Sequence, residues 1–326
     1  MLTRREFGST SAAALFALRS GPQAPATAAR AQRYVHLDVF TDTALAGNQL
    51  LVYTAPTGLT TEQMQALTRE SNYSENTFAL PPEQAGTDYR VRIFTRTAEA
   101  PFAGHPTIGT AFALAHTGAI KAGTPRVVFG LGVGPTPLDL EWSNARLRFA
   151  WMTQLNPTFG KPVSDTGALA AAMSLNPGDV VRAAQEVNCG SNFLIVPIAS
   201  RRAVDAAALD RAKIDAVFAA AGLQRRGLYI VTTDRGSDDA TAYSRLLGTG
   251  GIEDPATGSA AGPAGCYLAK YGLVPAERLG SMVFLQGVLA GRPSRLHVKI
   301  GGSGSDITKV QVGGASVIVG EGTVML

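Results

Sequence analysis

The sequence is poor in the residues on which metal and redox sites depend. Its 326 residues include only two cysteines and four histidines. Cys189 and Cys266 stand far apart, form no Cys-x-x-Cys pair and have no histidine nearby in sequence. We therefore expect no metal site. An oxidising compartment would permit a disulfide between them, but two buried free thiols are the interpretation that we favour.

Long apolar runs, nucleotide-binding loops and basic stripes are missing as well. No segment reaches the roughly 20 apolar residues that a membrane-spanning helix needs. No Gly-x-Gly-x-x-Gly follows an expected strand and opens a helix, which argues against a doubly wound fold and against a nucleotide cofactor. Lysine and arginine form no stripe that would indicate a nucleic-acid partner. We expect a cofactor-free protein that binds neither nucleic acid nor, after removal of its N-terminal segment, a membrane.

The N-terminal segment, residues 1–31, has the pattern of a twin-arginine signal peptide. Arg4-Arg5 precedes a modest apolar run from Phe7 to Leu18, and Ala29-Arg30-Ala31 is a small-x-small cleavage pattern. Residues 1–31 hold four arginines and one glutamate, so their removal lowers the formal net charge from +4 to +1. We expect Tat-dependent export to the periplasm and a mature chain that begins near Gln32. An Ala-rich tail without a targeting role is the alternative.

The remainder of the chain, roughly 295 residues and long enough for two domains, contains an internal repeat. When the sequence is shifted so that Tyr89 falls on Tyr243, two segments align without gaps. Further identical pairs include Glu99/Glu253, Pro101/Pro255, Gly104/Gly258, Leu114/Leu268, Ala115/Ala269 and Gly118/Gly272. Each half reads as strand, helix, strand, strand and a helix of small residues, with further strands after it.

The repeated helices predict the fold class. Residues 109–115 and 259–265 carry almost no charge on any face, and a helix that is apolar all round has to be buried. We expect an α+β protein of two pseudo-repeat halves, each a mixed β-sheet or roll wrapped around a buried central helix. The halves should span residues 34–155 and 156–326, with the last strand as a candidate to return to the first half.

Both repeated helices begin at a turn rich in Gly, Pro and Thr, at residues 103–107 and 254–259. The first N–H groups of a helix lack intrahelical partners and carry partial positive charge. If the halves face each other, two such ends converge on one cleft and can hold a carboxylate-bearing substrate. Thr107, Thr257 and Ser259 could instead serve only as helix caps, but two turns in register favour a site for a small anionic metabolite.

One carboxylate distinguishes the two halves where a strand begins. Glu75 follows Ser74 in the first half, whereas the equivalent stretch of the second half, residues 224–227, has no acid. A carboxylate in a single copy of a duplicated site is a candidate acid/base group, because burial and neighbouring helix ends tune its pKa. An exposed turn residue is the alternative. His105 and Asp254, at the two helix starts, could polarise the substrate or act as the partner acid.

Longer motifs extend these observations. They are Asp38-Val39-Phe40-Thr41 with Ala46-Gly47-Asn48, Ser74-Glu75-Asn76-Thr77-Phe78, Pro101 to Gly109, Glu253 to Ala260, and Gln286-Gly287 with Gly291 to Ser294. Together they resemble the PhzF family, which is named for a phenazine-biosynthesis isomerase and has the diaminopimelate-epimerase-like fold. The similarity runs from about Tyr34 to the C-terminus. Three residues depart from the family's usual pattern and could alter the cleft rim: Gln49, Arg96 and Ala100.

The resemblance implies a cofactor-independent isomerase in which Glu75 shuttles the proton and His105 and Asp254 line the site. It also implies that backbone N–H groups near the two helix starts bind the substrate's anionic group. The predicted substrate-binding residues are Ser74, Gly104, Thr107, Thr257, Gly258 and Ser259. We also expect a homodimer.

Two other functions remain open at this point. An amino-acid racemase or epimerase of the same fold would use two cysteines as bases, but the helix starts here carry Gly104-His105 and Asp254-Pro255. A non-catalytic protein could keep the anion-binding cleft without turnover, since a fold alone does not establish a function. A Glu75 far from both helix ends would favour such a binding protein.

Overall fold

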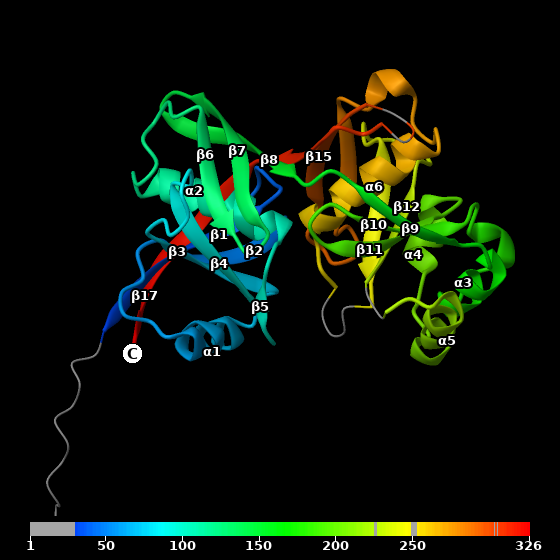
Figure 1. Ribbon diagram of the computed structural model, residues 1–326, viewed down its shortest axis with the longest axis horizontal. Coiled ribbons are helices and arrows are strands. Elements are labelled where there is room, and N and C mark those ends of the chain that lie inside the picture. Colours follow the sequence, from blue (N-terminus) through cyan, green and yellow to red (C-terminus); the bar gives the residue numbers. More distant parts are fainter. Residues whose placement is uncertain (1–29, 225–226, 249–252, 303, 305) are drawn as a thin grey trace, which may run out of the picture.

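The computed structural model contains two halves of mixed sheet and helix that lie side by side (Figure 1). It describes residues 30–326 except 225–226, 249–252, 303 and 305. Each half holds one helix that is buried along nearly its whole length, α2 (Gly104–His116) in the first and α6 (Gly258–Lys270) in the second. The predicted α+β class, with a mixed sheet around a central helix in each half, is confirmed.

The elements of the first half are β1 (Ala31–Val39), β2 (Asn48–Tyr53), α1 (Thr61–Ser71), β3 (Glu75–Leu80), β4 (Tyr89–Thr95), β5 (Glu99–Ala100), α2, β6 (Arg126–Leu131), β7 (Gly134–Ser143) and β8 (Arg146–Gln154). Those of the second half are β9 (Thr158–Val163), α3 (Thr166–Ala172), the 3₁₀ turn η1 (Pro177–Asp179), β10 (Ala184–Asn188), β11 (Asn192–Pro197), α4 (Arg201–Ala206), α5 (Arg211–Ala221), β12 (Leu228–Thr232), β13 (Ala242–Leu247), α6, η2 (Ala276–Arg278), β14 (Met282–Gln286), β15 (Ser294–Gly301), β16 (Lys309–Gly314) and β17 (Ser316–Met325).

The internal repeat reappears as a repeated strand order. Strand β2 pairs in parallel with β3, and β3 pairs antiparallel with β4, just as β11, β12 and β13 do. The parallel pair β4–β6 corresponds to β13–β14. Beyond it, β6, β7 and β8 form an antiparallel meander that matches β14, β15 and β16. The sequence repeat therefore reflects two copies of one topology.

The two halves are joined by strand pairing and by an exchange of strands. Strands β8 and β16 pair antiparallel across the junction. After β8 the chain enters the second half, where β9 pairs with β10. After β16 it returns to the first half, where β17 pairs with β1; Figure 1 shows this last strand, in red, running through the first half to the C-terminus. Each half is thus completed by a strand that follows the other half's meander.

The start of β1 bears on the predicted signal peptide. Residues 1–29 lie outside the described part of the chain. Ala31, the last residue of the predicted peptide, already pairs with Met325, and Arg30 exchanges two backbone hydrogen bonds with Leu326. Cleavage after Ala31 would remove the first residue of β1, so the folded domain begins slightly earlier than residue 34. Export stays a prediction.

Side-chain chemistry explains which helices are buried and which are not. Helix α2 consists mostly of small and apolar residues, and those from Gly104 to Leu114 are all buried, as its lack of charge requires. Helix α1 instead buries one face, with Met64 and Leu67 inward. It begins with a capping box in which Thr60 and Gln63 each accept the other's backbone N–H. The outer helices therefore cover the sheets, while α2 and α6 form the interior.

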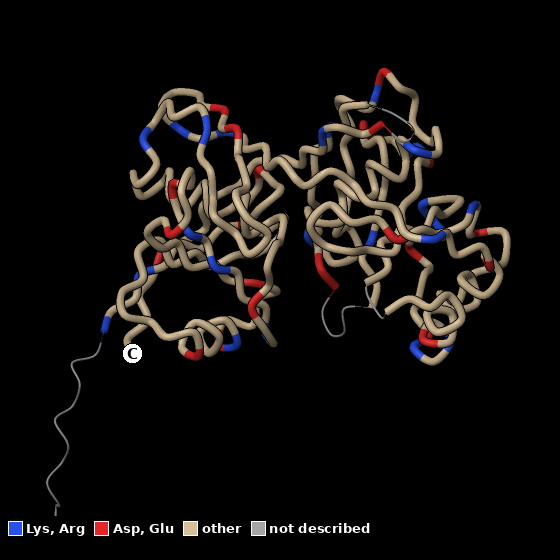
Figure 2. Tube along the Cα trace, viewed as in Figure 1, with Lys and Arg blue, Asp and Glu red and all other residues tan. Residues whose placement is uncertain are grey.

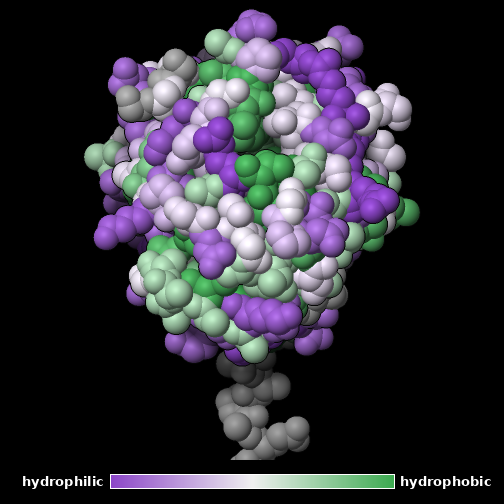
Figure 3. Space-filling model, turned by 90° about the vertical axis from the view of Figure 1, so that its right-hand side faces the viewer, coloured by the Kyte–Doolittle hydropathy of each residue, from purple (hydrophilic) through white to green (hydrophobic). Residues whose placement is uncertain are grey.

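Charge and hydropathy are mixed over the surface. Figure 2 shows acidic and basic residues interspersed over both halves. Figure 3, which looks onto the end of the second half, shows hydrophilic side chains with smaller apolar areas between them. Among the described residues, no helix is both long and apolar enough to cross a membrane. The homodimer stays a prediction.

Arg292 connects the two halves through a buried carboxylate. From the turn before β15 it forms an ion pair with Asp38 of β1 and donates hydrogen bonds to the carbonyls of Ala46 (2.8 Å) and Gly47 (2.7 Å). The Asp38 side chain is only 2% exposed, and its other oxygen accepts the backbone N–H of Leu45 at 2.7 Å. Removal of one partner from a buried ion pair leaves an uncompensated charge.

We predict that Arg292→Met lowers the free energy of unfolding by about 3 kcal/mol, because Asp38 then remains buried without its countercharge. Arg295→Met is a matched control, since Arg295 pairs with the exposed Asp239 and such surface pairs contribute about 0–1 kcal/mol. Urea unfolding followed by circular dichroism measures both. Equal losses in the two variants would show that the Arg292 contact is no stronger than a surface pair.

Candidate active site

A cavity of about 440 Å³ lies between the two halves. Its lining includes Ser74 and Glu75 from the first half and Asp254, Thr257 and Ser259 from the second. This volume falls within the range of about 300–1,000 Å³ that small-molecule sites occupy. The structure therefore brings five of the predicted site residues around one space.

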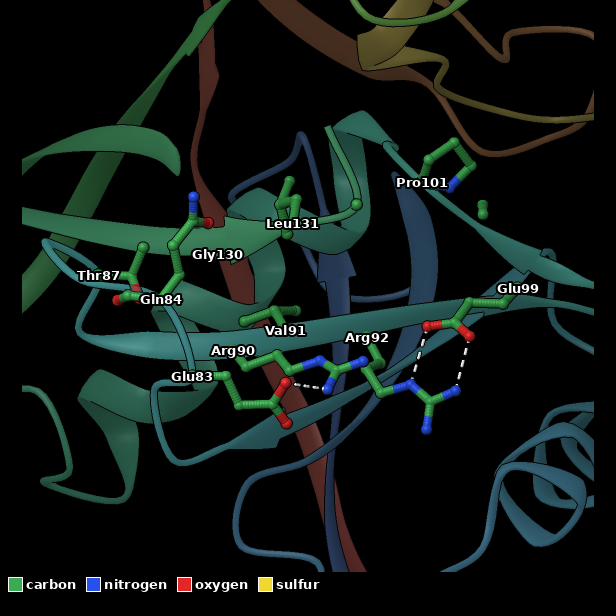
Figure 4. Close-up of a pocket in the computed structure, with 12 residues that line it drawn as sticks. Glu83, Gln84, Thr87, Arg90, Val91, Arg92, Glu99, Pro101, Gly130 and Leu131 are labelled. Atoms are coloured by element: carbon green, nitrogen blue, oxygen red, sulfur yellow. Dashed lines mark hydrogen bonds and ion pairs between the residues drawn. The ribbon is translucent and has the colours of Figure 1, made fainter. Parts of the chain in front are cut away.

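A second cavity, of about 460 Å³, opens in the first half beside β4 (Figure 4). Its two arginines are already paired: Arg90 with Glu83, and Arg92 with both oxygens of Glu99 at 2.8 and 2.6 Å. None of the predicted acid/base residues lines it. We therefore assign the candidate site to the cavity that contains Glu75.

The N-termini of the two central helices meet beside this cavity. A Cβ added to Gly104 would lie 2.5 Å from the Cα and carbonyl carbon of Gly258, so only glycine permits the two helix ends to approach this closely. Neither N-cap residue, Ala103 in α2 or Thr257 in α6, makes a side-chain cap. Uncapped first-turn N–H groups are donors without partners, which suits them to an anion.

Thr107 and Thr257, for which helix capping was the alternative role, do not act as caps. The Thr107 hydroxyl donates to the Ala103 carbonyl at 2.6 Å, within its own helix. The Thr257 hydroxyl donates to the Asp254 carboxylate at 2.7 Å. The helices begin at Gly104 and Gly258, within the two Gly-, Pro- and Thr-rich turns. Thr107 is consequently buried one turn inside α2 and does not line the cavity.

Glu75 is the first residue of β3, and its side chain is 20% exposed. One of its carboxylate oxygens, Oε2, lies 3.7 Å from Nε2 of His105. Burial, and secondarily the negative charge of Asp254, raises the pKa of Glu75 to about 8, against the opposing effects of Ser74 and Arg96. A carboxyl group with this pKa can hold a proton at neutral pH and also give it up there, as acid/base catalysis requires.

His105 is neutral and has a free ring nitrogen. Burial lowers the pKa of His105 to about 3. Its Nδ1 lies 3.1 Å from Nδ2 of Asn48, while its Nε2 is buried and has no hydrogen-bond partner among the described residues. Because buried polar atoms are nearly always paired, Nε2 is suited to a hydrogen bond with a bound substrate beside Glu75.

Asp254 is fixed by hydrogen bonds on both carboxylate oxygens. Asn48 donates to Oδ1 at 2.6 Å, and Thr257 donates to Oδ2 at 2.7 Å. Burial raises the pKa of Asp254 to about 6, although the bonds from Thr257 and Asn48 favour its charged form. Asp254 is therefore a second group that titrates near neutral pH, close enough to Glu75 to affect its pKa.

Two amide side chains that the sequence did not single out as site residues organise this network. Asn48 bonds to Asp254 and also to the Ala256 carbonyl at 2.9 Å. Gln286 donates to the Asp254 carbonyl and the Thr257 hydroxyl, both at 2.9 Å, and accepts the Thr257 N–H at 3.1 Å. Each is a buried polar residue at the end of an otherwise mostly apolar strand, β2 or β14, and that placement is the signal that could have identified them.

The two cysteines are buried neighbours and not a pair of bases at the site. They are free thiols, with Sγ atoms 3.9 Å apart, and Cys266 lies inside α6. The contact with Cys189, together with burial, raises the pKa of the Cys266 thiol far above its ordinary range. A thiol that cannot ionise is not a base, and neither cysteine lines the cavity.

We predict that Glu75→Gln stabilises the protein, and does so more at pH 9 than at pH 5. Folding raises the pKa of Glu75, so below its unfolded value of about 4.3 both states hold the proton. Between that value and about 8 the unfolded state releases the proton while the folded state keeps it, so stability falls over this range and stays low above it. The variant avoids this loss, and we expect its melting temperature to exceed the wild-type value by several degrees at pH 9.

Differential scanning calorimetry at the two pH values measures this difference. Glu70→Gln is the control, because Glu70 is an exposed residue of α1. A gain in melting temperature that is the same at pH 5 and pH 9 would mean that Glu75 is not an acid weakened by burial.

Known proteins match this chain over nearly its whole length, in sequence and in structure. The sequence model of the PhzC-PhzF family, described as phenazine biosynthesis-like protein, matches residues 37–322. A trans-2,3-dihydro-3-hydroxyanthranilate isomerase of Pseudomonas aeruginosa is 36% identical, over 90% of this chain and 99% of that protein. A solved structure from Pseudomonas aeruginosa, described as a predicted epimerase, matches with a TM-score of 0.74 and 31% identity, over 90% of this chain and 99% of that one. A PhzF-family phenazine biosynthesis protein of Bacillus anthracis matches with a TM-score of 0.78 and 22% identity, over 91% of this chain and 100% of that one.

Proposed function

Because this chain belongs to the PhzC-PhzF family of phenazine biosynthesis-like proteins and is an isomerase, we propose that it moves a proton at carbon in a small carboxylate-bearing substrate, without a cofactor. The observation that carries the proposal is the position of Glu75. It is a carboxyl group with a pKa near neutral pH, in a cavity beside two uncapped helix N-termini.

Each group has a part in the proposed reaction. The N–H groups at the starts of α2 and α6 bind the substrate carboxylate and withdraw electron density from the neighbouring carbon. Ionised Glu75 takes a proton from a saturated carbon whose electrons can delocalise toward that carboxylate, and returns it at another carbon. His105, neutral and with Nε2 free, donates or accepts one hydrogen bond to the substrate during the transfer. Asp254 is, beside Glu75, the second carboxyl group of the site that titrates near neutral pH.

The relative from Pseudomonas aeruginosa suggests the first substrate to test. Its name identifies trans-2,3-dihydro-3-hydroxyanthranilate, a cyclic monocarboxylate. The cavity is large enough for such a ring, and Phe102, Phe193 and Leu246 give its lining an apolar part. We propose a cyclic carboxylate of about this size as the substrate, and this compound as the first one to test.

Isomerisation can be tested with that compound by liquid chromatography and mass spectrometry. We expect a product of unchanged mass and changed retention, formed only when the enzyme is present. Binding of the compound without any product would instead favour the non-catalytic anion-binding protein. Product formation abolished by Cys266→Ala, with the fold retained, would favour the two-thiol mechanism.

A further inference from the structure

Arg96 has a position in the site that the mechanism above does not use. It follows the last residue of β4, Thr95, which is paired directly opposite Glu75 in the sheet. Arg96 is half-buried and lines the cavity, and it is near enough to lower the pKa of Glu75. Its guanidinium group therefore lies at the rim of the space in which the proton is moved.

Arg96 also differs from Arg90 and Arg92 of β4 in having no partner among the described residues. Arg90 is paired with Glu83, and Arg92 with Glu99 (Figure 4). Arg96 makes no hydrogen bond and no ion pair with any residue of the described chain. A half-buried guanidinium has five N–H donors, and here all of them are available to a ligand.

Arg96 is the one positively charged side chain in the described lining of the cavity. Within the described lining, the other ionisable side chains are those of acids, namely Glu75, Glu253 and Asp254, and of Tyr73. Glu253 is neutralised by Arg245 through two hydrogen bonds of 3.0 and 2.9 Å, and Asp254 is held by Asn48 and Thr257. Neither acid makes an ion pair with Arg96.

Two separate groups of donors therefore face the cavity. The uncapped ends of α2 and α6 form the first, and Arg96, in the turn between β4 and β5, forms the second. Aromatic and aliphatic side chains, Phe102, Phe193 and Leu246, line the same cavity. This arrangement matches a molecule with an apolar ring and two anionic groups, one for each group of donors.

We propose that Arg96 binds a second anionic group of the substrate, so that this enzyme prefers cyclic dicarboxylates, or similar dianions, over monocarboxylates. The inference rests on the proposed function, because it takes the helix ends as the site of the first carboxylate. Arginine suits the second one, since its planar guanidinium can bind a carboxylate through two parallel hydrogen bonds.

Calorimetric titration with benzoate and the three benzenedicarboxylates, phthalate, isophthalate and terephthalate, tests the proposal. Because the isomers differ in the distance between their carboxylates, we expect at least one to bind the wild-type protein ten-fold or more tightly than benzoate. In Arg96→Gln this preference should disappear, while benzoate affinity stays within about two-fold. Arg96→Lys should retain part of the preference. Arg90→Gln, at the other cavity, should retain all of it.

Three results would overturn the proposal: no dicarboxylate binds better than benzoate, the preference survives in Arg96→Gln, or benzoate affinity falls with it. A fall in benzoate affinity would mean that Arg96 and the helix ends bind the same carboxylate. The titrations need no turnover and can be repeated in Glu75→Gln, in which the preference should persist. Failure of proton transfer and failure of the Arg96 proposal are therefore distinguishable.

Discussion

Glu75→Gln is expected to lower the rate of isomerisation by about 10²–10⁴-fold, the usual range for loss of a general base. The glutamine keeps the size and polarity of the side chain beside His105 but cannot accept a proton. Substrate affinity should change little, because the helix ends that hold the anion are formed by the backbone of α2 and α6. Steady-state rates over a range of substrate concentrations separate the two effects.

Two further variants test whether the loss of isomerisation rate comes from the missing Glu75 carboxylate. Glu75→Asp keeps the carboxylate but shortens the side chain. We expect a rate between those of the wild type and Glu75→Gln, which still depends on pH through the ionisation of a carboxyl group. Glu70→Gln removes an exposed carboxylate of α1 and should be fully active. If Glu75→Gln is as active as the wild type, another residue is the base, and Asp254 is the next candidate.

Gly104→Ala is expected to have the second large effect, on both stability and anion binding. The added Cβ would lie 2.5 Å from the Gly258 backbone and from the Ser259 nitrogen. These are backbone atoms, which cannot rotate away, so the two helix ends must separate. We expect a loss of about 1–3 kcal/mol in the free energy of unfolding and at least a ten-fold loss in affinity for benzoate.

Gly109→Ala, in the same helix, is the matched control. There the added Cβ would approach the side chains of Leu50 and Val39 at 2.5 and 2.8 Å, and these are core contacts remote from the helix ends. We expect lower stability with unchanged benzoate affinity. If both variants bind benzoate as the wild type does, the junction of the helix ends is not the anion site.

The fold could largely be predicted from the sequence because its main signals are local. An uncharged helix has to be buried wherever it occurs, and the duplicated motif placed one such helix in each half. The return of the last strand, β17, to the first half was a candidate in the sequence, but its pairing with β1 could not be predicted in the same way. Strand pairing such as Ala31 with Met325 joins residues from opposite ends of the chain, and no local pattern records it.

The start of α2 shows why the site was predicted less well than the fold. Gly104-His105-Pro106 reads as a turn, so the helix was expected near Thr107. Proline is nevertheless tolerated in the first turn of a helix, where its missing N–H would have no partner, and α2 begins at Gly104. Of the predicted anion contacts, Gly104 and Gly258 lie at the helix starts, whereas Thr107 is buried away from the cavity.

The site residues differ in how far the sequence could identify them. Glu75 was recognisable because it breaks the repeat, and asymmetry is visible in a self-alignment. Asn48 and Gln286 became visible as site residues only from their hydrogen bonds to Asp254. Arg96 was noted in the sequence as a departure at the cleft rim, but its lack of a partner among the described residues is a structural observation. Which buried amide meets which carboxylate is decided by tertiary contacts between halves.

The central claim, that Glu75 moves a carbon-bound proton, is tested most directly by hydrogen exchange in deuterated water. Wild-type enzyme and Glu75→Gln are each saturated with trans-2,3-dihydro-3-hydroxyanthranilate, with binding confirmed by titration, and deuterium at the substrate's carbons is followed by NMR. We predict incorporation at the reacting carbon with the wild type, and at least 100-fold slower incorporation with the variant although it binds the substrate. Equal rates of incorporation in the two proteins would contradict the claim.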